Sequence, residues 1–221
     1  MLSVCYKYAY IQLNKPVMPF LVLDLEMTGP EPDWNEIIQV GAVLFDDNWI
    51  ERGRYLTNVY PENEDAFSSL SEKIHNLSLA DLEDAPMMYD VLPEMEEWII
   101  KQLDIRKTQQ TNDNTQYLRD VIICGQSVIN DINFLKEAYR LEKLKWPYSR
   151  TLIDLHTLSY FAFRILKKNG KPVPQRLSLK DIAGHFGFER ESEHHNALED
   201  AVLTAQCLKE VFKLADTLKL S

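Results

Sequence analysis

The sequence has 221 residues, 45% of them hydrophobic, and a formal net charge of −10 at pH 7. Its length and apolar content are those of a compact globular protein with a sizeable core. The acidic balance argues against a protein that grips a long nucleic-acid duplex by its phosphates, but it leaves room for an enzyme that meets a phosphate through metal ions.

The first half of the chain predicts strands followed by helices. Residues 1–17 continue no clear pattern, and we interpret them as an extension of the core domain. Apolar runs with short connections predict antiparallel neighbouring strands over residues 20–25, 37–46 and 52–61. Helical pieces follow over 71–86, and then a helix over 87–103 with Pro86 in its first turn and a kink at Pro93.

The second half alternates strands and helices. A polar loop is predicted over 106–116 and a basic loop over 167–176. The predicted strands cover 121–126 and 151–154, and the predicted helices cover 130–141, 155–166, 178–188 and 196–219. This order predicts an α/β fold with a mixed sheet, and no position reads as a boundary between two domains.

The first predicted strand runs into two acids, in the segment FLVLDLEMTG. Residues two apart on a strand point to the same face, so Asp24 and Glu26 project together. Two like charges at this place cost free energy unless a cation lies between them. The alternative is that both acids lie beyond the strand and are solvated.

Two further acids stand at predicted helix starts. Asp131 follows the buried strand over 121–126 and lies in the first turn of a helix, where an acid also favours the helix N-terminus. Asp200 lies one turn into the last helix, and its alternative role is on a solvated helix face. His195 precedes it by five residues, and histidine can take a proton from water near neutral pH.

Taken together, these acids predict a metal site. Carboxylates from one strand end and two helix starts could bind two divalent ions through oxygen, as Mg²⁺ prefers. Two ions about 3.5–4 Å apart can orient a water and stabilise the charge on a phosphate and on the leaving oxygen. With a histidine base nearby, this is a site for phosphodiester hydrolysis.

Three segments carry a family resemblance. DLEMTG is similar to a motif D-x-E followed by a small polar residue and Gly, GQSVINDINFL to G-x-N/S-x-x-x-D-x-x-F-L, and HNALEDA to H-x-A-x-x-D-A. In this order they resemble the DEDD superfamily of 3′–5′ exonucleases, in its histidine subgroup. That subgroup includes the proofreading subunit of bacterial replicative polymerase, ribonuclease T and oligoribonuclease. The resemblance covers about residues 18–215.

The resemblance implies roles for individual residues. The implied ligands of two Mg²⁺ or Mn²⁺ ions are Asp24, Glu26, Asp131 and Asp200. His195 is the implied general base, because the five-residue step to the acid fits His195 and not His194. Met27 and Thr28 are implied to contact the terminal nucleotide. Gln126 and Ser127 stand where the second motif often has His-Asn, a departure that affects substrate contacts and leaves the ligands in place.

The resemblance also implies a fold and an activity. The fold is ribonuclease H-like, a five-stranded mixed sheet flanked by helices, with an exonuclease domain over 18–221 after the extension 1–17. The activity is metal-dependent hydrolysis at the 3′ end of single-stranded DNA or RNA, which releases nucleoside 5′-monophosphates. Two alternatives remain: a catalytically silent module that binds nucleic acid or a partner on the same fold, and an unrelated α/β protein with structural acids.

Partners and compartment follow from simpler signals. A basic cluster without acids, either a solvated helix end and loop or a rim for a single strand, consists of Arg164, Lys167, Lys168, Lys171, Arg176 and Lys180. The three cysteines form no zinc or disulfide pattern, no apolar run approaches the roughly 20 residues of a membrane span, and the N-terminus does not read as a signal peptide. We expect a cytoplasmic protein; the oligomeric state stays open.

Overall fold

The computed structural model describes residues 18–108 and 113–217. Within them, five strands form one mixed sheet in the order β3-β2-β1-β4-β5. The strands are β1 (Phe20–Met27), β2 (Ile37–Phe45), β3 (Glu51–Asn58), β4 (Ile122–Gly125) and β5 (Leu152–Asp154). β1 pairs antiparallel with β2 and parallel with β4, which confirms the predicted mixed sheet. The predicted extension, residues 1–17, lies outside the described residues.

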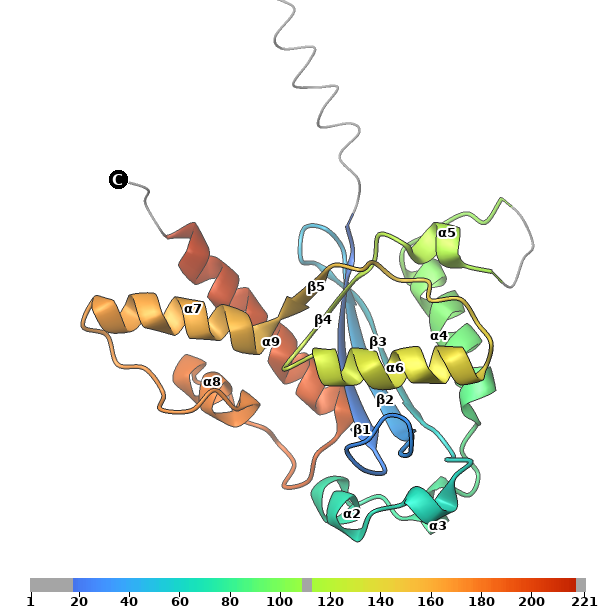
Figure 1. The fold of residues 1–221 in the computed structure, drawn as a ribbon. Helices are drawn as coiled ribbons and strands as arrows, with labels where there is room; N and C mark the ends of the chain where they lie inside the picture. Colours follow the sequence, from blue (N-terminus) through green and yellow to red (C-terminus); the bar gives the residue numbers. More distant parts are fainter. Residues whose placement is uncertain (1–17, 109–112, 218–221) are drawn as a thin grey trace, which may run out of the picture.

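Helices flank this sheet on both sides. They are η1 (Glu64–Ala66), α2 (Ser69–His75), α3 (Leu79–Leu82), α4 (Met88–Gln102), α5 (Thr115–Leu118), α6 (Ile129–Leu141), α7 (Leu155–Lys168), α8 (Leu179–Phe186) and α9 (Ala197–Asp216). Figure 1 shows α4 and α5 to the right of the strands, and α7 and α8 to the left. No helix in the described ranges is both long and apolar enough to cross a membrane.

The central strand β1 separates two hydrophobic clusters because its side chains alternate. Leu21, Leu23 and Leu25 belong to the cluster that contains α4 and α6 residues. Val22 belongs to the cluster that contains α8 and α9 residues. Asp24 and Glu26 continue the alternation of Val22, so the strand period alone directs both acids to the face covered by α9.

The start of α9 lies directly on the sheet, which requires a glycine in β2. Gly41 pairs with Asp24 across the two strands. A Cβ at Gly41 would lie 2.1 Å from the carbonyl carbon of Ala197, the first residue of α9. The buried Gln39 completes the contact, because its Oε1 accepts a hydrogen bond of 2.9 Å from Ala197 N. Strand β2 therefore determines how closely α9 approaches the acids of β1.

Some local predictions were wrong at their edges. Pro86 precedes the helix instead of forming its first turn: α4 begins at Met88, and the carbonyl of Pro86 accepts a hydrogen bond from Tyr60 N at 2.9 Å. Pro93 lies inside α4 without ending it. Tyr89, whose carbonyl loses its partner at Pro93, is exposed near the helix start, so water can replace the missing donor. The predicted polar loop over 106–116 ends earlier, because α5 already begins at Thr115.

Candidate active site

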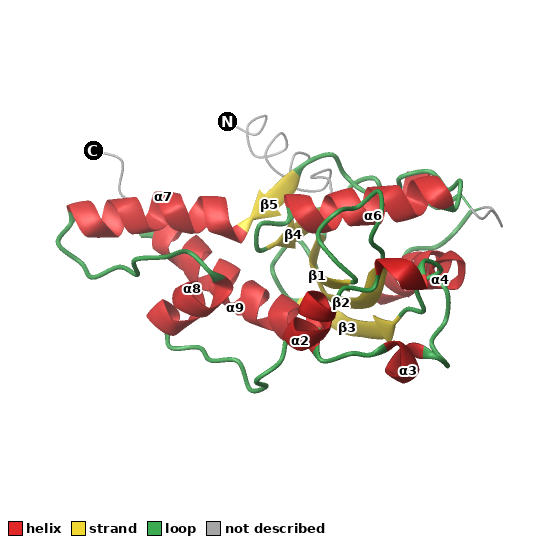
Figure 2. Cartoon of the chain, turned by 60° about the horizontal axis from the view of Figure 1, so that its bottom comes forward, coloured by secondary structure: helices red, strands yellow, loops and turns green. Residues whose placement is uncertain are grey.

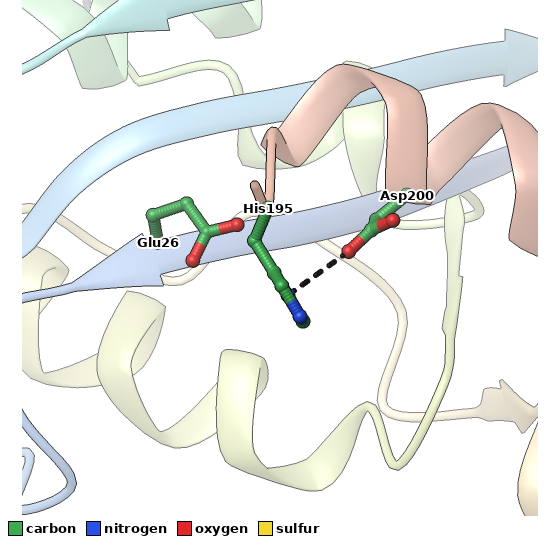
Figure 3. Close-up of side chains that lie close together, drawn as sticks. All are labelled: Glu26, His195 and Asp200. Atoms are coloured by element: carbon green, nitrogen blue, oxygen red, sulfur yellow. Dashed lines mark ion pairs between the residues drawn. The ribbon is translucent and has the colours of Figure 1, made fainter. Parts of the chain in front are cut away.

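The end of β1 places two carboxylates beside the start of α9. Glu26 is 6% exposed, and no hydrogen-bond partner for its Oε1 lies in the described part of the chain. Figure 3 shows its carboxylate near the imidazole of His195, with Asp200 beyond it. An acid that is buried without donors is costly, and a cation is the partner that would remove this cost.

Asp131, in α6, lies against the same end of β1. It lies in the first turn of that helix, is 7% exposed, and its Oδ1 accepts a hydrogen bond of 3.1 Å from Leu25 N. The backbone between Asp24 and Glu26 is thus tied directly to this third acid. The turn that leads into α6 is held by Asp154, whose Oδ1 accepts a hydrogen bond of 2.8 Å from Ser127 N.

Asp200 and His195 come from the other side, at the start of α9. Asp200 is 2% exposed, and its Oδ2 lies 3.3 Å from Nδ1 of His195. Asn196 caps the helix by accepting from Glu199 N, and His195 N donates to the carbonyl of Ile74 in α2 at 3.0 Å. The ring of His195 faces the acids (Figure 3).

The acids raise one another's pKa. Burial raises the pKa of Asp24 well above its ordinary value, and the charges of Asp131, Asp200 and Glu26 raise it further. Burial raises the pKa of Glu26 to about 7, against the opposing charge of His195. Burial also raises the pKa of Asp131 to about 7, although the hydrogen bond from Leu25 N acts in the opposite direction. The sequence keeps several acids where each disfavours the charge of the others, a pattern typical of functional sites.

A divalent metal ion fits this donor set. One ligand atom each from Glu26, His195 and Asp200 lies within 4.8 Å of the others. Asp24 and Asp131 interact electrostatically with these acids, so carboxylate oxygens dominate the site, as hard cations require. The unpartnered Oε1 of Glu26 is the local sign that a positive group belongs here.

The residues expected to contact a nucleotide lie beside this cluster. Thr28 is fully buried, and its Oγ1 already accepts a hydrogen bond of 3.0 Å from Glu36 N. The side chain of Met27 is half-buried, so of the two it is the one that a ligand can reach. Gln126 is engaged elsewhere, since its Nε2 donates to the carbonyl of Leu177 at 2.8 Å.

Three residues with clear positions in the site were missed by sequence reasoning. Arg190 donates from Nε to Asp200 Oδ1 at 2.8 Å and from a terminal nitrogen to Oδ2 at 2.7 Å. Gln39 and Gly41 seat the start of α9 on the sheet. The segment ERESE around Arg190 read only as a charged loop, and nothing in the spacing of Gln39 and Gly41 indicated a partner more than 150 positions away.

Comparison with known sequences identifies relatives that degrade or copy nucleic acid. The family model RNase_T, described as an exonuclease, matches residues 21–115. The subunit epsilon of DNA polymerase III from Aquifex aeolicus is 31% identical over 197 residues, which is 88% of this chain and 80% of that protein. A PolC-type DNA polymerase III from Thermotoga petrophila is 29% identical over 187 residues, 85% of this chain but 11% of that protein.

Comparison with solved structures identifies the same fold. The nuclease domain of 3′hExo, a DEDDh family member bound to rAMP, has a TM-score of 0.67 at 18% identity and covers 94% of this chain and 96% of that one. The zinc-bound complex of Escherichia coli ExoI with single-stranded DNA has a TM-score of 0.70 at 15% identity. It covers 90% of this chain and 42% of that one.

Proposed function

The chain belongs to the DEDDh family of 3′–5′ exonucleases, enzymes that hydrolyse phosphodiester bonds with divalent metal ions, and we propose that it shortens single-stranded nucleic acid from the 3′ end using two Mg²⁺ or Mn²⁺ ions. On this proposal the catalytic domain spans residues 18–221. The product is a nucleoside 5′-monophosphate, because water attacks the last phosphorus and the preceding O3′ leaves.

One observation carries the proposal: Glu26 is buried, its Oε1 has no hydrogen-bond partner among the described residues, and it lies beside His195 and Asp200 at the strand end that also holds Asp24. A structural acid would have acquired donors, since leaving it unpaired costs stability. A module that only binds nucleic acid has no physical need for mutually repelling acids. The arrangement therefore favours catalysis over the silent alternative.

The proposed chemistry is divided between the four acids and His195. Asp24, Glu26, Asp131 and Asp200 would hold the ions, which supply charge compensation on the phosphate and a more acidic water. Asp200 lies against Nδ1 of His195, so a proton on that nitrogen leaves Nε2 free to accept one from the attacking water. Met27, at the rim of the cluster, is the side chain that would contact the terminal nucleotide.

A basic and aromatic surface supports a single-stranded substrate. It comprises the exposed side chains Tyr160, Phe161, Arg164, Lys167, Lys168, Lys171, Arg176 and Lys180, on α7, the segment after it and α8. In the segment between α7 and α8, the carbonyl of Leu177 accepts a hydrogen bond of 2.8 Å from Gln126, at the end of β4. Cations that track phosphates and rings that stack on bases together favour single strands without sequence preference.

The test uses matched oligonucleotides labelled at the 5′ end: single-stranded DNA, single-stranded RNA, a blunt duplex and a dinucleotide. Each is incubated with Mg²⁺, Mn²⁺ or EDTA. We expect a ladder of products that shortens from the 3′ end of single strands with either ion and not with EDTA. The DNA and RNA arms decide the sugar, which depends on how the site treats the 2′-hydroxyl.

Two results would contradict the proposal. Binding of all substrates without any shortening, at every metal concentration, would indicate the silent module instead. Release of the labelled 5′ nucleotide in the first turnover would indicate the opposite polarity. The surface on α7 is tested separately, because Tyr160→Ala and Phe161→Ala should raise KM for single strands while kcat stays unchanged.

A further inference from the structure

Arg190 engages both oxygens of an acid that the metal ions need. The hydrogen bonds to Asp200 measure 2.8 and 2.7 Å, one to each carboxylate oxygen. The side chain of Asp200 is 3% exposed and that of Arg190 is 20% exposed. The pair is therefore largely withdrawn from water, where a bidentate arginine–carboxylate contact is at its strongest.

The charge of Arg190 also reaches the other acids. The pKa of Asp24 and that of Glu26 are raised chiefly by burial, and in both cases the guanidinium of Arg190 acts in the opposite direction. Arginine stays protonated at every relevant pH, whereas His195 carries a charge only when it binds a proton. Arg190 is thus a permanent positive group at a cluster of acids.

The loop that carries Arg190 is fixed to the same helix as Asp200. This loop joins α8 to α9, and the backbone N–H groups of Glu191 and Ser192 both donate to Oε1 of Glu199. The Ser192 hydroxyl also donates to the other oxygen of Glu199. Because these contacts do not involve Arg190, its side chain can leave Asp200 without unfolding the loop.

A divalent ion and the guanidinium compete for Asp200. An ion bound to that carboxylate would lie within a few ångströms of Arg190, and two positive charges at such a separation repel strongly when both are partly buried. Each oxygen that the ion would use already accepts a hydrogen bond from Arg190. Ion binding and the arginine contact therefore oppose each other.

We propose that Arg190 is a positioning residue that serves as the resident counter-ion of Asp200: it neutralises the metal-free cluster and leaves Asp200 when a divalent ion binds. This inference rests on the proposal that the four acids hold divalent ions. It assigns Arg190 two effects of opposite sign. Arg190 stabilises the metal-free fold, and it weakens metal binding by the cost of its own displacement.

A purely structural arginine would behave differently. Its removal would lower the stability of the metal-free protein, and metal affinity would stay the same or fall with the disturbed site. A resident counter-ion predicts a loss of stability without metal together with a gain in metal affinity. The sign of the change in affinity therefore separates the two roles without any measurement of catalysis.

The experiment is calorimetric titration of the full chain with Mn²⁺, beside thermal unfolding in EDTA, for the wild type, Arg190→Gln and Arg190→Lys. Arg140→Gln is the matched control, because Arg140 makes a similar double contact with Glu137 on the exposed side of α6. We expect Arg190→Gln to bind Mn²⁺ roughly tenfold more tightly, which corresponds to about 1.4 kcal/mol. Its unfolding temperature in EDTA should fall.

Arg190→Lys keeps the positive charge but loses the planar guanidinium that contacts both carboxylate oxygens. Its Mn²⁺ affinity should therefore lie between those of the wild type and Arg190→Gln. Arg140→Gln should leave Mn²⁺ affinity unchanged. An Arg190→Gln protein that unfolds cooperatively and binds Mn²⁺ with equal or lower affinity would overturn the inference while the proposed function stands. A wild-type protein that binds no Mn²⁺ would overturn both.

Discussion

Two buried carboxylates in this molecule have opposite surroundings. Glu96 in α4 is 5% exposed, and its oxygens accept hydrogen bonds from the Tyr139 hydroxyl at 2.8 Å and from Asn114 Nδ2 at 2.9 Å. Glu26 is 6% exposed, has an unpartnered Oε1 within the described chain, and lies near a further acid, Asp200, as well as His195 and Arg190. Both have a raised pKa with burial as the largest cause.

Burial of an acid therefore does not by itself mark a functional site. Neutral donors satisfy Glu96, which joins α4, α5 and α6 and leaves nothing for a ligand to do. At Glu26 burial raises the pKa to about 7 although the charges of His195 and Arg190 lower it, and Oε1 has no donor in the described residues, so a bound cation is the partner that we propose. We therefore assign Glu96 to stability and propose that Glu26 serves chemistry.

Asp24→Asn should reduce the rate of hydrolysis more than any other variant considered. Loss of a carboxylate ligand should lower the rate of single-strand hydrolysis by at least about 10³-fold, as removal of a central electrostatic group does in other enzymes. Unfolding in EDTA should show unchanged or higher stability, since one of several repelling charges is gone. If the variant is active, or if it no longer unfolds cooperatively, Asp24 has a structural role and not the proposed catalytic one.

The related variant Asp200→Asn should differ from Asp24→Asn in its effect on stability. We expect it to abolish hydrolysis as well, because it also removes a ligand. Its stability in EDTA should fall and not rise, since the charge of Arg190 would lose the carboxylate that faces it. The two variants thus act alike on activity and differ in the sign of their effect on stability.

His195→Ala should slow turnover by roughly 10²–10⁴-fold, the usual contribution of a general base. We expect Mn²⁺ affinity to be largely retained, because carboxylates provide most of the ligand atoms. His194→Ala serves as the control, since its side chain is exposed. If His194→Ala is the impaired protein and His195→Ala is near normal, the assigned register of the third motif is wrong.

Sequence reasoning found the acids because their positions follow from local periodicity. Asp24 and Glu26 share a face through the strand period, and Asp131 and Asp200 lie in the first turns of helices that long apolar patterns make easy to predict. The antiparallel pairing of β1, β2 and β3 follows from the short connections between them. What remained hidden depends on contacts between distant segments. Short-range rules say nothing about such contacts.

Arg190, Gln39 and Gly41 illustrate that limit. An arginine among the glutamates of a loop reads as solvated until the fold places Asp200 beside it. Gly41 reads as a weak point of a strand, and only the approach of Ala197 explains it. Thr28 shows the converse, because a motif directs attention to a hydroxyl that the fold buries in a turn.

The variant Glu96→Ala tests the structural role of Glu96. The substitution removes the main acceptor of the Tyr139 hydroxyl and of Asn114 Nδ2, which keep only the 3.4 Å contact to Tyr148 and the bond to Glu97. It also leaves a cavity, and a buried donor without a good acceptor costs about 1–3 kcal/mol. We expect the free energy of unfolding to fall by roughly 2–4 kcal/mol, measured by urea denaturation. The folded protein should hydrolyse single strands at the wild-type rate. A large loss of activity at unchanged stability would contradict a structural role for Glu96.

The smallest effect concerns pH and the metal-free protein. The pKa of Glu26 rises from 4.5 to about 7 on folding, so between these values the folded state binds a proton that the unfolded state has released. The stability that this group contributes is complete below about pH 4.5 and is lost as the pH rises through 7, an effect of up to about 3 kcal/mol.

Unfolding in EDTA across this pH range should therefore show a steeper decline of stability for the wild type than for Glu26→Gln. Glu96→Gln should not flatten the curve to the same extent, because neutral donors already satisfy that carboxylate and oppose the rise of its pKa. Saturating Mg²⁺ should reverse the slope for the wild type, because the ion binds the deprotonated acids and becomes a stronger ligand as protons leave. Parallel pH curves for the wild type and Glu26→Gln, with and without Mg²⁺, would show that Glu26 is not the group whose buried charge calls for a cation.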